Sequence, residues 1–176
     1  MKQRILAILL SLTMMFTLVP TAMAEGDETP AVKTTTGDVT YSDNDAKIEN
    51  LVYTSGTMTV TGANVTVENV TFGDGAALKV NTSGNFTLKN CTFNGKTDVR
   101  TPVTLNVGSA TVTGNTFNGT KTDGTPTYYN AIEFAVSSGN KLSSATLSNN
   151  IFEAAIKNNY FSFYNMTDNA VINIRD

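Results

Sequence analysis

The residues best suited to chemistry lie in one short charged loop, 94–101, with the sequence NGKTDVRT. Lys96, Asp98 and Arg100 follow one another at intervals of two positions. A carboxylate is a ligand that Ca²⁺ prefers, and a cationic side chain stabilises negative charge that develops on a substrate. The three residues are therefore candidates for catalysis. They also suit a charged loop that is simply solvated.

Most other catalytic groups are missing. The sequence has no His, which removes the commonest general base and the commonest zinc ligand. Cys91 is the only cysteine, so we expect a core thiol and neither a disulfide nor a nucleophile. Asp74 and Glu133 are scattered acids that nothing in the sequence pairs as acid and base. We predict no cofactor and no metal, although backbone carbonyls with Asp74 or Asp98 leave calcium as an option. The absence of His and of a complete catalytic motif argues against an enzyme, but it leaves the question open.

Tyrosine rings offer a surface for recognition. Tyr128 and Tyr129 lie in a long insert at 119–130, and Tyr160 and Tyr164 follow later. Tyrosine rings stack on sugars and also anchor protein interfaces. We predict a ligand-binding role for Tyr128, Tyr129 and Tyr164, with core packing as the alternative. The usual sugar-stacking residue, Trp, is absent.

The first residues have the pattern of a secretory signal. Lys2 and Arg4 precede an apolar run at 5–19, and Ala22-Met23-Ala24 supplies the small residues that a signal peptidase reads. We expect residues 1–24 to be removed and the protein to be secreted or extracellular, either free or held at the cell surface, with no membrane span left. Removal leaves 10 basic and 15 acidic residues, a net charge of −5. Nucleic acid is then an unsuitable partner, because phosphate binding needs clustered Lys and Arg.

The elements that must position these residues come from an internal repeat. Residues 25–40 are polar and are predicted to be a flexible lead-in, and residues 41–176 are predicted to form one domain. In that domain four segments align without gaps, and their closing Phe residues are 21, 24 and 35 positions apart. The segments are 65–72 (VTVENVTF), 86–93 (FTLKNCTF), 110–117 (ATVTGNTF) and 145–152 (ATLSNNIF).

Each segment contains a bend between two strands. Val65 and Val67 share one parity, whereas Val70 and Phe72 have the other, so both pairs face a core only if the chain turns between them. Asn and Gly, which tolerate a left-handed backbone, occupy the break. The same break occurs in all four segments, at 68–69, 89–90, 113–114 and 148–149.

Stacking of the segments places equivalent residues in columns. One inward column beside the bend would hold Val70, Cys91, Asn115 and Asn150, with the two Asn forming a short hydrogen-bonded ladder. Outward columns are rich in Thr, either as a solvated face or as a regular hydroxyl array for a crystalline surface. These Thr columns are Thr66, Thr87, Thr111 and Thr146, and then Thr71, Thr92 and Thr116.

A third strand follows each segment, at 77–80, 103–107, 131–136 and 161–164, and a final strand is expected at 170–174. Residues 48–60 have the composition of one earlier turn. The predicted fold class is therefore all-β: a right-handed parallel β-helix, a three-sheet solenoid of about five turns. The alternative is an antiparallel sandwich, which would not require a shared register among the segments.

The repeat Val-Thr-Leu/Val-x-Asn-x-Thr-Phe resembles that of the pectate-lyase-like parallel β-helix superfamily over residues 48–176. The resemblance implies this fold, but it covers lyases, hydrolases, adhesins and binding modules. Lyases of this kind use calcium-binding carboxylates with an Arg or Lys base. Arg100-Thr101-Pro102 is similar to the start of their Arg-x-Pro-x-x-Arg motif, but Leu105 stands in place of the second Arg. The Trp- and His-containing motif of the lyases and the motifs of the related hydrolases are missing.

Three functions stay open on this basis. The first is a non-enzymatic module for extracellular binding or adhesion, with polysaccharide or a cell-surface glycan as the partner. The second is a minimal pectate-lyase-like polysaccharide lyase that uses Lys96, Asp98 and Arg100. The third is a structural or assembly fragment of a larger β-helix protein. We also expect self-association through the strand edge at 172–176, while residues 25–47 fold across the other end.

Overall fold

The computed structural model describes residues 32–95, 100–119, 123–125, 128–134, 140–153 and 156–176. They form one 14-stranded sheet in which every strand pair is parallel. No helix in these ranges is long and apolar enough to cross a membrane. The predicted signal at 1–24 lies outside the described residues.

The strands are β1 (Lys33–Thr35), β2 (Val39–Tyr41), β3 (Lys47–Tyr53), β4 (Gly56–Val60), β5 (Val65–Phe72), β6 (Ala76–Lys89), β7 (Thr92–Phe93), β8 (Val103–Thr113), β9 (Thr116–Phe117), β10 (Asn130–Phe134), β11 (Leu142–Ser148), β12 (Ile151–Phe152), β13 (Asn159–Phe163) and β14 (Met166–Arg175).

The pairings divide the sheet into three parallel ladders. Ladder A joins the start of β3, the start of β5, the ends of β6 and β8, β11 and β14. Ladder B joins β1, the ends of β3 and β5, β7, β9 and β12. Ladder C joins β2, β4, the starts of β6 and β8, β10 and β13.

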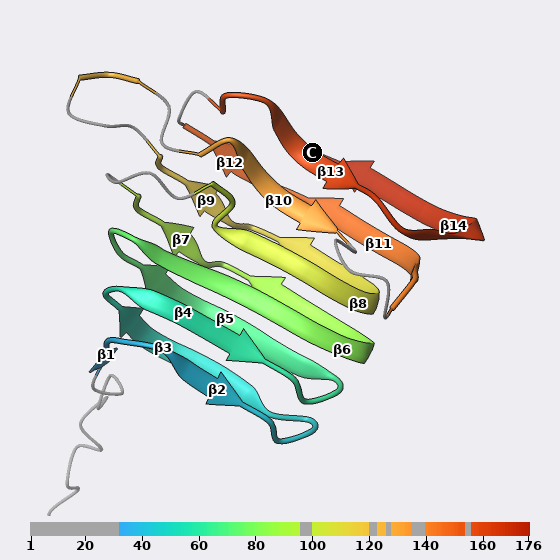
Figure 1. The fold of residues 1–176 in the computed structure, drawn as a ribbon, viewed down its shortest axis with the longest axis horizontal. Helices are drawn as coiled ribbons and strands as arrows, with labels where there is room; N and C mark the ends of the chain where they lie inside the picture. The colour runs from blue at the N-terminus through green and yellow to red at the C-terminus, as the bar shows by residue number, and fades with distance from the viewer. Residues whose placement is uncertain (1–31, 96–99, 120–122, 126–127, 135–139, 154–155) are drawn as a thin grey trace, which may run out of the picture. The chain divides into compact units, whose positions relative to one another are not determined.

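The chain visits ladders A, B and C in turn and then returns to A. Figure 1 shows the result for ladder C, where β2, β4, β6, β8, β10 and β13 follow one another up the sheet in chain order. The predicted third strands and the final strand are confirmed where they are described, because they coincide with β6, β8, β10, β13 and β14. An antiparallel sandwich is excluded, since all of the pairs between described strands are parallel.

The predicted alignment of the four segments is confirmed residue by residue. Val65 pairs with Phe86, Phe86 with Ala110, and Ala110 with Ala145. The closing Phe residues pair in the same way, from Phe72 to Phe152. The extra residues in the 24- and 35-residue repeats lie in the connections between the ladders, so they do not shift this register.

The predicted bends are also confirmed. Asn69, Asn90 and Asn149 have φ angles of 54°, 52° and 53°, and Gly114 has a φ of 67°. This left-handed backbone costs most L-residues about 1–2 kcal/mol, and Asn and Gly adopt it most readily. Asn50, with a φ of 53°, makes the same bend in the earlier turn at 48–60.

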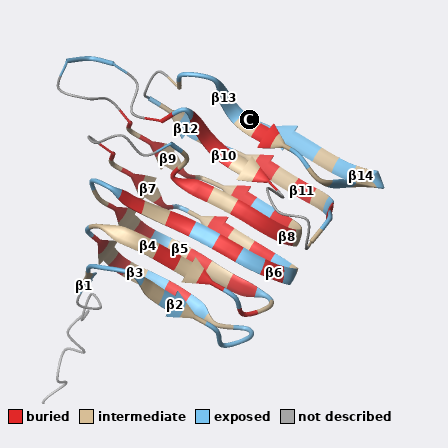
Figure 2. Ribbon diagram, in the orientation of Figure 1, coloured by how far each residue is buried: buried red, intermediate tan, exposed pale blue. Residues whose placement is uncertain are grey.

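The core lies between the three ladders and is filled by the alternating inward residues. In β5 the inward residues Val65, Val67, Val70 and Phe72 are each at most 1% exposed. The closing Phe rings form a continuous stack, with centroids 4.5 Å apart for Phe72–Phe93, 4.8 Å for Phe93–Phe117 and 5.0 Å for Phe117–Phe152. These separations match the strand spacing of about 4.8 Å, so register and ring stacking support each other. In Figure 2 the buried residues concentrate in the middle strands, and β14 is largely exposed.

The structure differs from the prediction at the N-terminal end. β1 and most of β2 lie within the range predicted as a flexible lead-in, 25–40. They bring ladders B and C to six members, the number that ladder A has without them, where about five turns were expected. Strands of three residues are too short for alternation to reveal them. Their pairing with β3 and β4 stabilises them, as do side-chain bonds such as Thr57 N to Asp38 Oδ1 at 2.8 Å. Residues 25–31 lie outside the described ranges.

Candidate functional site

An exposed tyrosine ring between two cations is the most distinctive surface feature. Tyr129 is 38% exposed. The Arg100 guanidinium carbon lies 5.5 Å from the centroid of its ring, and the Lys157 ammonium nitrogen lies 5.9 Å from it. Both distances are within the range of cation–π attraction, about 6 Å. We call these three residues the Tyr129 cluster.

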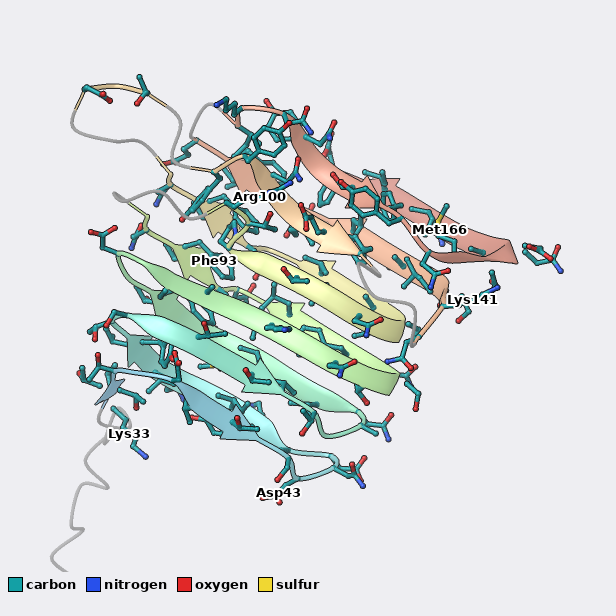
Figure 3. The ribbon with its side chains drawn as sticks, viewed as in Figure 1. Lys33, Asp43, Phe93, Arg100, Lys141 and Met166 are labelled. Atoms are coloured by element: carbon teal, nitrogen blue, oxygen red, sulfur yellow. The ribbon has the colours of Figure 1, made fainter. Side chains whose placement is uncertain are left out.

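The cluster is built by three successive passes of the chain. Arg100, Tyr129 and Lys157 each precede a strand of ladder C, namely β8, β10 and β13. The Tyr129 amide donates to the Arg100 carbonyl at 2.9 Å, and the Asn158 amide donates to the Tyr129 carbonyl at 2.8 Å. These backbone bonds continue the parallel pairing beyond the strands, and they hold the side chains one strand spacing apart. Figure 3 shows Arg100 beside the later strands and well separated along them from Met166.

Tyr128, the neighbour of Tyr129, is buried, which agrees with core packing, the alternative to its predicted binding role. Its side chain is 2% exposed, and its hydroxyl accepts a bond from the Gly95 amide at 2.8 Å. A Cβ at Gly95 or Gly119 would lie only 2.6 Å or 2.4 Å from Tyr128 atoms, so both glycines are needed for this packing. Burial raises the pKa of Tyr128 to about 12.

A polar network borders the cluster. Asn130 is 1% exposed, and its Oδ1 accepts a bond from Asn158 Nδ2 at 3.0 Å. Its Nδ2 donates to Glu133 Oε1 at 2.5 Å. The Glu133 carboxylate is therefore held by a buried amide, in an outward column between Thr104 and Ser162. This network fixes the start of β10 directly after Tyr129.

The remaining predicted site residues are Lys96, Asp98 and Tyr164. Lys96 and Asp98 lie outside the described residues, so Arg100 is the one member of the candidate catalytic set that the structure describes. Tyr164 is 61% exposed and follows β13, whereas Tyr129 precedes β10. Because these strands are parallel, the two tyrosines lie at opposite ends of ladder C, six residues or roughly 20 Å apart along the strand direction. Asp74 lies in the turn between β5 and β6.

The inward column beside the bend has the predicted structural role. Cys91 is fully buried, and desolvation raises the pKa of its thiol to about 12, so the thiolate is disfavoured. Asn115 Oδ1 accepts from the Cys91 amide at 2.9 Å, and Asn115 Nδ2 donates to the Leu88 carbonyl at 3.1 Å. Asn150 continues the ladder by accepting from Asn115 Nδ2 at 2.9 Å. Both amides thus satisfy backbone groups at the bend.

The two outward Thr columns are in register. Thr66, Thr87, Thr111 and Thr146 pair in sequence along ladder A, as do Thr71, Thr92 and Thr116 along ladder B. The next outward column of ladder A is charged at one end, where Glu68 bonds to Lys89 at 2.9 Å and to Lys47 at 3.4 Å. Those ion pairs interrupt the hydroxyl face, which favours a solvated surface over an extended hydroxyl array.

Sequence reasoning missed Lys157. Its position was nevertheless encoded, because Asn130 pairs with Asn159 and this offset places Lys157 and Asn158 against Tyr128 and Tyr129. Extending the alignment of the repeat to the third strands would have found it.

The described residues hold no group of three or more His, Cys, Asp or Glu that could bind a metal ion. A scan of protein-family models, a search of curated proteins and a search of solved structures found no match to the chain.

Proposed function

We propose that this chain is a secreted, non-enzymatic binding module, folded as a right-handed parallel β-helix of three sheets, that binds glycans through the Tyr129 cluster. The single observation that carries the proposal is the exposed Tyr129 ring between the cations of Arg100 and Lys157. The β-helix supports it because repeated passes hold three side chains at fixed spacing on one surface.

The chemistry of the cluster favours an anionic sugar. The cations of Arg100 and Lys157 both lie over the Tyr129 ring, so the ring orders the two charges and leaves its exposed edge and hydroxyl to contact a sugar. A guanidinium pairs with a carboxylate in a bidentate manner, and an ammonium adds a second positive charge. The chain as a whole is acidic, with a net charge of −3, so two cations beside one exposed ring form a local exception. A polysaccharide of uronate units meets all three groups.

A glycan array probed with the exported protein tests the proposal. We expect retention on polyuronates, and weaker retention on neutral glycans of equal length. Tyr129→Ala should lower the affinity about 10-fold or more, because the ring that orders both cations is lost, which corresponds to about 1.4 kcal/mol. Tyr164→Ala is the matched control, since Tyr164 is an exposed tyrosine at the other end of ladder C. Equal loss in both variants, or no binding to any glycan, would refute the proposal.

The same protein should be incubated with polygalacturonate, with and without calcium, while unsaturated products are followed. A binding module releases none. Robust turnover that Arg100→Ala abolishes would replace this proposal with the lyase alternative.

A further inference from the structure

The two ends of the ladders carry matching features. At one end β12, β13 and β14 each pair on one side only among the described residues, with β9, β10 and β11. At the other end β1, β2 and the start of β3 likewise pair on one side only within the described ranges. In the part of the chain that the structure describes, each end therefore presents one unpaired edge from each of the three ladders. A parallel edge accepts a further strand at about 4.8 Å.

The end formed by β12, β13 and β14 leaves core positions uncovered. Ile174 continues the inward column of Val112 and Leu147, but it is 59% exposed whereas Leu147 is 1% exposed. A hollow of about 110 Å³ lies beside it, lined partly by Phe152 and Phe161. The apolar side chains of this last pass thus resemble those of an inner pass, but no described strand packs over them.

The opposite end offers a complementary surface. A hollow of about 310 Å³ is lined by four apolar or aromatic residues and four charged ones: Tyr41, Ala46, Ile48 and Leu51, and Lys33, Asp43, Lys47 and Glu49. Ile48 begins the inward column that ends at Ile174. Tyr41 begins the column that ends at Phe163. The next layer on Ile174 and Phe163 would therefore be Ile48 and Tyr41 of another copy.

The charges at the two ends are complementary as well. One outward column of ladder A begins at Glu49 and ends at Arg175. Within the same column Glu68 and Lys89, which lie one strand apart, form an ion pair at 2.9 Å. Glu49 pairs with Lys47 of its own copy at 2.6 Å. A second copy in register would place this Glu49 one strand spacing from Arg175, so that it could pair with two cations as Glu68 does with Lys47 and Lys89.

We propose that a second copy of this chain docks head to tail, with the end that carries β1, β2 and the start of β3 stacked on β12, β13 and β14. All three ladders then continue as parallel sheets, whereas two like ends would meet in antiparallel pairing. The contact is heterologous, so each added copy leaves an open end and growth continues into short filaments. This proposal does not depend on glycan binding.

Sedimentation velocity over a concentration series tests the head-to-tail contact. The exported protein should form species larger than a dimer as concentration rises, and they should weaken with salt. Arg175→Glu alone and Glu49→Arg alone should each weaken association at least 10-fold. An equal mixture of the two variants should restore association. In the mixture the carboxylate introduced at position 175 of one variant meets the guanidinium introduced at position 49 of the other, and the unaltered Arg175 meets the unaltered Glu49.

The control is Lys79→Glu, which replaces a cation with a carboxylate as Arg175→Glu does. Lys79 is exposed and lies between Thr59 and Thr104 in the middle of ladder C. It should associate like the unaltered protein. Circular dichroism of each variant confirms that the fold is retained. A protein that stays monomeric at high concentration overturns the proposal. So does a closed dimer that Arg175→Glu disrupts and Glu49→Arg leaves intact, since that pattern indicates contact between two like ends.

Discussion

Replacing Phe93 with Ala removes the centre of the aromatic stack. Phe93 is fully buried and lies between Phe72 and Phe117, with both ring pairs within 4° of parallel. Truncating a buried Phe to Ala typically costs about 3–5 kcal/mol, which includes the cavity left behind. Two stacked partners are lost, each worth about 0.5–1.5 kcal/mol, so we expect the upper part of that range. For a domain of this size, that loss lowers the Tm by about 6–20 °C.

Urea unfolding followed by circular dichroism measures the change, with Phe152→Ala as the matched control. Phe152 occupies the same column in the last pass, but it is only partly buried. Its truncation should therefore cost clearly less, about 1–2 kcal/mol for a partly exposed aromatic side chain. A near-neutral Phe93→Ala, or equal effects at the two positions, would refute the assignment of Phe93 to a stacked interior column.

Three further predictions concern the thiol, the bends and alkaline stability. Cys91 should resist thiol reagents in the native protein and react only on unfolding; rapid native labelling would show that its register is wrong. Asn69→Ala should destabilise by about 1 kcal/mol in urea titration because φ is 54°, whereas Asn69→Gly should be close to neutral; the reverse order would contradict the left-handed bend. Burial raises the pKa values of Cys91 and Tyr128 to about 12, so the stability they contribute is fully present below their unfolded pKa values, near 9 and 10, and is lost as pH rises towards 12. Unfolding free energies between pH 7 and 11 should fall accordingly and fall less in Tyr128→Phe, and a flat profile would contradict the burial of both groups.

The parallel register was predictable because the sequence records it several times. A parity break at a left-handed Asn or Gly recurs with a closing Phe, and gapless alignment of these segments gives the observed pairs from Val65 to Ala145. β1 and β2 were not predictable in the same way. Each is three residues long and depends on β3 or β4 for pairing, so its stability comes from tertiary contacts rather than from its own pattern.

The candidate site was only partly predictable. Arg100 and Tyr129 were both identified, but for different roles and without a reason to associate them. Their proximity arises because backbone pairing between long connections brings positions 100, 129 and 157 together. The type of residue also does not reveal which neighbouring tyrosine is buried. Tyr128 points inward because Gly95 and Gly119 leave room for its ring, and Tyr129 consequently points outward.

The most direct test of glycan binding at the Tyr129 cluster is an NMR titration of the isotope-labelled protein with tetragalacturonate, and with a neutral tetrasaccharide as control. The Tyr129 cluster predicts that the signals of Arg100, Tyr129 and Lys157 shift together and saturate with the acidic ligand, while Tyr164 stays unchanged. The neutral ligand should produce much smaller shifts. Perturbations confined to the Thr columns of ladders A and B, or equal responses to both ligands, would contradict the assignment of the Tyr129 cluster as a site for anionic sugars.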